Sequence, residues 1–144
     1  VKKTDEALEK LVNYFKEADE DTVILFFGDH QPASYVSNPV FKIQNIDPNS
    51  LNEEQNLLKY KVPYMIFSNY DTALESREET SLNYLAIDLL EACGLPLPPL
   101  QTYLKTLRES YPVISALRPA EDVTYQSLQY YMLFDGDFAD GAEE

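Results

Sequence analysis

The sequence predicts an α/β fold, with a few-stranded, mostly parallel sheet and helices that flank it. Segments with helical periodicity alternate with two apolar segments, 23–27 and 62–67, that are rich in β-branched and aromatic residues. Neither segment alternates with polar residues, which is typical of strands covered on both faces, as in parallel sheets. A typical sheet has about five or six strands, and only two are predicted here. We therefore expect either a further strand elsewhere or a chain that is part of a larger domain.

The first half of the chain contains three predicted elements. Residues 4–18 form an amphipathic helix, because apolar residues recur at helical spacing from Leu8 to Phe15. The strand at 23–27 follows and ends at Gly28. Residues 31–49 form a long polar connection, and a connection of that length usually has a task, such as covering a site.

The second half adds further helices around the second strand. Ser50 and Glu53 make a capping-box pair that marks the start of a short helix. Cys93 lies on the predicted apolar face of a later helix, where we expect it to be part of the core. The segment 120–134 is compatible with a helix or an edge strand. The predicted segments of this half are a short helix at 50–60, a strand at 62–67, helices at 81–93 and 100–111, and an acidic tail at 135–144.

The charge composition excludes some classes of partner. Eleven basic and 25 acidic residues give a formal charge of −14. Nucleic acid binding requires clustered Lys and Arg, so no nucleic acid partner is expected. The same acidity disfavours flat docking on anionic lipid. An anionic substrate would need a cation to mediate its contact with the protein.

The stretch "FFGDHQP", residues 26–32, is the strongest candidate site. Asp29 and His30, the only histidine of the chain, directly follow the first strand. Ligands of open α/β sheets bind beyond the carboxyl ends of the strands. Carboxylate and imidazole together suit a divalent metal, and Gly28 permits the turn that lets both side chains reach one ion. The alternative is that Asp29 caps a turn and His30 bonds to backbone. Short motifs often match by chance, and such a match would have only this structural role.

Two ligands do not complete a metal site, because catalytic zinc usually has about three protein ligands. The remaining ligands would therefore come from outside this chain. Gln31 and Ser34 follow the pair and are candidates for contact with substrate, although Gln31 is equally compatible with a solvent-facing amide. Asn69 and Asp71 follow the second strand, where an Asx turn is the favoured interpretation.

Three blocks carry a resemblance to a known family. They are "LEKLVNYFKEADEDTVILFFGDHQPASY", "YKVPYMIFSNYD" and "SLNYLAIDLLEACGLPLPPLQTYLKTLRESYPVI". Their order and spacing resemble the C-terminal half of the sulfatase-like domain of lipoteichoic acid synthase and related phosphoglycerol transferases. These proteins belong to the alkaline phosphatase superfamily. The resemblance implies that residues 1–134 are the C-terminal segment of a partial, sulfatase-like catalytic domain.

The resemblance also implies a chemistry. Asp29 and His30 match two metal ligands of the family, whose cation is commonly Mn²⁺, with Zn²⁺, Mg²⁺ and Ca²⁺ as alternatives. The family's threonine nucleophile, acidic ligand and substrate-binding histidine lie upstream of this pair and have no counterpart here. The resemblance therefore implies no catalytic residue in this segment, which would be inactive alone and would need the upstream half of the domain as its partner.

The implied parent is a bacterial protein anchored in the cell membrane, with this domain outside the cell and the segment itself soluble. Its substrate would carry an anionic glycerophospholipid head group, and self-association of the segment is a further expectation. Two other functions stay open. One is a segment of a sulfatase or phosphoethanolamine transferase, and the other is a non-catalytic, acidic α/β binding module.

Overall fold

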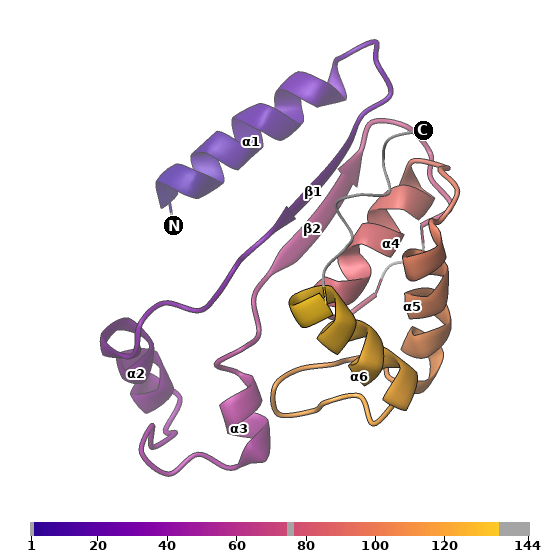
Figure 1. Ribbon diagram of the computed structural model, residues 1–144. Coiled ribbons are helices and arrows are strands. Elements are labelled where there is room, and N and C mark those ends of the chain that lie inside the picture. The colour runs from indigo at the N-terminus through magenta and orange to yellow at the C-terminus, as the bar shows by residue number, and fades with distance from the viewer. Residues whose placement is uncertain (1, 75–76, 136–144) are drawn as a thin grey trace.

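The computed structural model describes residues 2–74 and 77–135. An α/β arrangement with few strands and flanking helices is confirmed, and segment 120–134 is helical from residue 123 onward (Figure 1). Residues 136–144, most of the predicted acidic tail, lie outside the described residues. The elements are α1 (Lys2–Lys16), β1 (Val23–Phe27), α2 (Ser34–Ile43), α3 (Glu53–Leu57), β2 (Tyr64–Ser68), α4 (Leu82–Ala92), α5 (Pro99–Ser110), α6 (Val123–Tyr130) and the π-helical turn η1 (Tyr131–Asp135).

The two strands form an antiparallel hairpin, so the prediction of a mostly parallel sheet is wrong. Val23 lies opposite Ser68, and Phe27 lies opposite Tyr64. Parallel pairing would require the chain to return to the start of β1 before β2 begins. Instead, the connection carries α2 and α3 beyond the end of β1 and re-enters the sheet at that same end (Figure 1).

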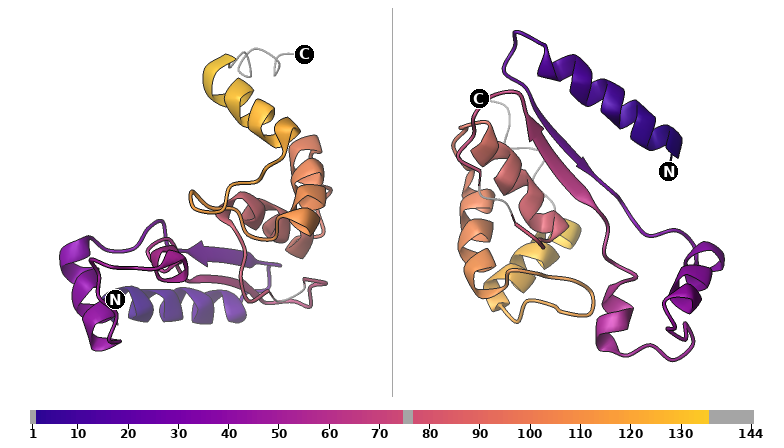
Figure 2. Two further views of the ribbon diagram at one scale, coloured as in Figure 1. Left: turned by 90° about the horizontal axis from the view of Figure 1, so that it is seen from below. Right: turned by 180° about the vertical axis from the view of Figure 1, so that it is seen from behind.

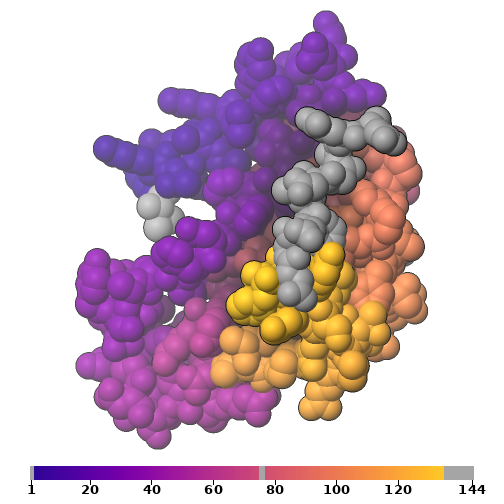
Figure 3. Space-filling view, viewed as in Figure 1, coloured from indigo at the N-terminus to yellow at the C-terminus, as the bar shows by residue number. Residues whose placement is uncertain are grey.

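The strands are half-buried, whereas the sequence predicted strands covered on both faces. No residue of β1 or β2 is fully buried, and Phe27 is 44% exposed. Helix α1 lies on one side of the hairpin and α4 to α6 lie on the other (Figure 2). The space-filling view likewise places the indigo N-terminal helix and the orange helix α5 on opposite sides of the molecule (Figure 3). Within the described residues, each strand has only one neighbouring strand, so both outer edges of the sheet remain open.

The predicted polar connection 31–49 contains a helix. Helix α2 forms despite Pro39, which lies inside it, and its buried residue Phe41 anchors it. This helix was not predicted from the sequence, because proline normally interrupts a helix interior. The N-cap of the short helix α3 lies two residues later than predicted. Its capping box is formed by Asn52 and Gln55 rather than by Ser50 and Glu53, with both reciprocal hydrogen bonds present.

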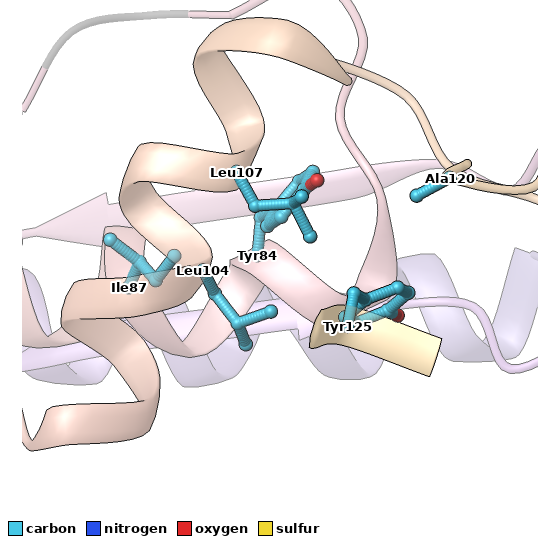
Figure 4. Close-up of a cluster of buried hydrophobic side chains, with 6 residues drawn as sticks. All are labelled: Tyr84, Ile87, Leu104, Leu107, Ala120 and Tyr125. Atoms are coloured by element: carbon cyan, nitrogen blue, oxygen red, sulfur yellow. The ribbon is translucent and has the colours of Figure 1, made fainter. Parts of the chain in front are cut away.

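The hydrophobic core lies among α4, α5, α6 and the segment that precedes α6 (Figure 4). A buried ion pair joins α4 to α5, with Arg108 Nη1 2.6 Å from Asp88 Oδ1. The predicted core position of Cys93 is wrong, because this residue is exposed. Helix α4 instead presents Ile87 and Asp88 to the interior, since Asp88 has a buried partner on α5. The core cluster consists of Tyr84, Ile87, Leu104, Leu107, Ala120 and Tyr125.

Candidate metal and substrate site

Asp29 and His30 lie at the end of β1 and point their polar atoms toward each other. The Gly28 amide donates to the Pro63 carbonyl at 3.0 Å, which extends the hairpin by one residue. The His30 amide then donates to Asp29 Oδ1 at 2.8 Å. His30 Nε2 lies 3.5 Å from Asp29 Oδ2, and the side chains are 79% and 85% exposed, respectively. A carboxylate and an imidazole are therefore adjacent and accessible.

The free atoms of this pair fit a shared divalent ion. Two ligands of one tetrahedral ion with bonds of about 2.1 Å lie about 3.4 Å apart, close to the observed 3.5 Å between Nε2 and Oδ2. His30 Nδ1 lies 2.9 Å from the Gln31 carbonyl. The tautomer that donates from Nδ1 to this carbonyl leaves the lone pair on Nε2, and metal-ligating histidines usually make such a second bond.

The pair is half of a metal site at most. No group of three or more His, Cys, Asp or Glu side chains that could hold an ion occurs among the described residues. The ligand role of Asp29 and His30 stays a prediction, and any further protein ligand would have to come from elsewhere.

Gly28 has a different role from the predicted one. Its φ is not positive, so the turn does not require the conformational freedom of glycine. A Cβ added at this position would instead lie 3.0 Å from Val62 Cβ. Gly28 therefore allows the two chain segments to approach closely where the hairpin ends.

Two neighbouring grooves surround the end of the hairpin. Asp29 and His30 line the first, of about 420 Å³, together with the first turn of α4. Gln31 and Ser34 line the second, of about 480 Å³, on the side of α2. The Gln31 side-chain amide also donates to the Lys61 carbonyl, so it is not a free solvent-facing amide. The structure thus places the predicted metal and substrate residues side by side but in separate grooves.

Asn69 and Asp71 lie at the opposite end of the hairpin, because β2 is antiparallel to β1. Asn69 Oδ1 accepts from the Thr22 amide at 2.8 Å. Its Nδ2 donates to carbonyls at the end of α1 and in the turn that follows, including Phe15 at 3.0 Å and Glu20 at 2.9 Å. Asn69 therefore connects β2 to α1, and neither the expected sheet edge nor an Asx turn describes its role.

Three basic residues that line the first groove were not predicted from the sequence. Lys59 and Lys61 precede β2, and Arg118 lies in the loop before α6; all three line the first groove. An antiparallel register would have revealed the two lysines, because it places the start of the second strand beside the end of the first. Lys61 pairs with Glu79, and Arg118 Nε lies 4.0 Å from Glu53.

One groove residue has a shifted pKa. Tyr64 lines the first groove and donates its hydroxyl to the Arg77 carbonyl at 2.5 Å. Burial raises the pKa of Tyr64, and the negative charge of Asp88 raises it further. Tyr64 therefore remains a neutral hydrogen-bond donor at physiological pH.

The chain matches the model of a known protein family. The sulfatase family model matches residues 1–95, two thirds of the chain, so the protein belongs to the sulfatase family and the alkaline phosphatase superfamily. Sulfatase-family domains generally use a divalent metal.

A relative in Rhizobium meliloti (strain 1021) is named "Putative cyclic beta-1,2-glucan modification protein". It is 25% identical to this chain over 116 residues, which is 79% of this chain and 18% of the relative. The chain therefore spans less than a fifth of that protein. No solved structure gives a significant match. None of the helices in the described ranges combines the length and apolar character that crossing a membrane requires.

Proposed function

We propose that this chain is the C-terminal segment of a metal-dependent phosphoglycerol transferase and supplies two ligands, Asp29 and His30, to the metal. The observation that carries the proposal is the 3.5 Å separation between Asp29 Oδ2 and His30 Nε2, with the other polar atoms of both side chains already bonded to backbone. Family membership supports a divalent metal, and the "GDHQP" block supports the phosphoglycerol branch of the superfamily. Mn²⁺ is the ion we favour.

In this proposal each residue has a defined task. Asp29 contributes negative charge that partly neutralises the ion, while His30 binds through neutral Nε2. A proton competes for that nitrogen, so metal affinity falls at acidic pH. The bound ion would polarise a phosphorus–oxygen bond of an anionic ester and stabilise the charge that develops during transfer. Such a cation would also offset part of the formal charge of −14, which disfavours an anionic substrate.

The donor would be a glycerophospholipid and the acceptor a glucan. The name of the Rhizobium relative concerns glucan modification, which makes a glucan the acceptor to test before a glycerophosphate polymer. The nucleophile and the other ligands would lie in an upstream half of the domain. The open edges of the β1–β2 hairpin provide a place for that half to pack. The complete protein would be anchored in the bacterial cell membrane with this domain outside the cell.

A transfer assay on a longer protein that contains this chain tests the proposal. With Mn²⁺, phosphatidylglycerol and a cyclic glucan, we expect glycerophosphate transfer that His30→Ala abolishes and that Glu17→Ala, on the exposed surface after α1, leaves intact. The 144-residue chain alone should release no head group. Full activity of the His30→Ala protein would contradict the metal role, and robust release by the isolated chain would contradict an upstream nucleophile.

A further inference from the structure

We propose that Lys59 binds the anionic group of the substrate, and that the groove lined by Gln31 and Ser34 holds the hydroxylated organic part of a phosphate or sulfate ester. The assignment of this ligand as substrate rests on the proposed function. Anion binding by the groove is a separate property that can be measured without any metal.

The second groove differs in charge from the rest of the protein. The chain has 25 acidic and 11 basic residues, yet no Asp or Glu occurs among the described residues that line this groove, and Lys59 is their only charged member. An anion in this groove meets one positive charge and no carboxylate among the described lining residues. The net charge of −14, by contrast, disfavours the approach of anions to the protein as a whole.

Other lysines form ion pairs, whereas Lys59 forms none with the residues that the structure describes. Lys61 pairs with Glu79, and Lys105 Nζ lies 2.6 Å from Glu91. No acidic group of the described residues lies within ion-pair distance of the Lys59 ammonium, and this side chain is exposed. A lysine that is not already paired can bind an external anion without first breaking an ion pair.

The position of Lys59 connects the two grooves. Lys59 and Tyr60 line both the groove of the metal pair and the groove of Gln31 and Ser34. An anionic ester whose charged end lies near Asp29 and His30 could therefore meet Lys59 as its organic part enters the second groove. That groove offers both hydrogen-bonding and apolar walls, which suits a small hydroxylated group. Beyond Gln31 and Ser34, its polar residues include Ser37 and Gln44, and its apolar residues include Val36 and Val40.

The test is a titration of the 144-residue chain with glycerol 3-phosphate in metal-free buffer, in which NMR chemical shifts report binding. We expect shift changes at Gln31, Ser34 and Lys59, and affinity on the order of five- to tenfold weaker in Lys59→Gln, as for loss of one charge-assisted hydrogen bond. Lys42→Gln is the matched control, because Lys42 lies on α2 and lines neither groove. Lys59→Arg should keep most of the affinity.

The outcomes separate this inference from the proposed function. A glycerol 3-phosphate titration without effect, or equal affinities of Lys59→Gln and Lys42→Gln, would overturn the role of Lys59. The role of Lys59 would also be overturned if uncharged glycerol bound with the same affinity as glycerol 3-phosphate. Anion binding that depends on Lys59 supports it, even if a separate Mn²⁺ titration shows no metal binding by Asp29 and His30. In that case the proposed function fails while the anion groove stands.

Discussion

Helices α4 to α6 and the hairpin with α1 are stabilised by different interactions. Eight of the ten buried apolar residues of the described chain follow residue 80, and α4 and α5 share a buried ion pair. Helix α1 has no buried residue, and the strands are only half-buried. Asn69 instead joins α1 to the hairpin through hydrogen bonds to four backbone groups. One region therefore depends on apolar packing, while the other depends on a polar connection.

The candidate site lies where these two regions meet. The first groove is lined by the end of the hairpin on one side and by the first turn of α4 on the other. Helix α4, which belongs to the packed region, supplies one wall, whereas the hairpin leaves the Asp29 and His30 side chains accessible. Binding elements commonly lie in the less stable parts of a protein, and the exposed side chains of Asp29 and His30 follow this pattern.

The largest expected effect is a difference in the free energy of unfolding when the same Ile→Ala substitution is made in each region. Ile87→Ala removes a fully buried side chain from the α4 core and should cost about 2–5 kcal/mol. Ile24→Ala on half-buried β1 should cost about half as much or less, since the lost contacts are fewer. Urea unfolding measures both free energies. Equal losses would show that the hairpin is packed as tightly as the helices.

Loss of the polar connection should affect α1 selectively. Asn69→Ala removes a hydrogen-bonded side chain shared by β2, Thr22 and the end of α1, at a cost of about 1–3 kcal/mol. Amide hydrogen exchange should rise in α1 and stay unchanged in α5. Asn56→Ala is the control, because its side-chain amide makes a single bond, to the Leu51 carbonyl. Unchanged protection of α1 in Asn69→Ala would contradict the role of Asn69.

The helical core should weaken in alkaline solution. Burial raises the pKa of Tyr84 and of Tyr103 to about 12, and a hydrogen bond to Asp122 contributes for Tyr103. The folded protein holds these protons more tightly than the unfolded chain, whose tyrosines titrate near a pKa of about 10. The stabilisation is therefore complete below about pH 10 and declines as pH rises to about 12.

Urea midpoints measured across this alkaline range check the prediction. Tyr84→Phe should show a smaller decline than the unmodified chain, because it lacks one of the two shifted hydroxyls. Tyr35→Phe, on the exposed surface of α2, should behave like the unmodified chain. A midpoint that stays constant between about pH 9 and 12 would show that these tyrosines do not couple ionisation to folding.

The sequence located most elements but not their directions. Apolar run length found β1 at its observed bounds and β2 within two residues, yet a run of apolar residues does not reveal strand direction. Only the antiparallel register places Lys59 beside the site and Asn69 away from it. The buried face of α4 was also missed, because it depends on pairing between Asp88 and Arg108, which are 20 positions apart in the sequence. The position of Asp29 and His30 at the end of β1 could be predicted from the sequence, since both directly follow the apolar run of the strand.

Manganese binding by the isolated chain tests the central claim most directly. Electron paramagnetic resonance reports free Mn²⁺, and the chain should remove free ion from solution with weak affinity, because it offers two protein ligands. Asp29→Asn and His30→Gln should each reduce binding by at least about tenfold, whereas Asp71→Asn, at the other end of the hairpin, should not. Binding that is unchanged in both site variants would contradict a metal held jointly by Asp29 and His30.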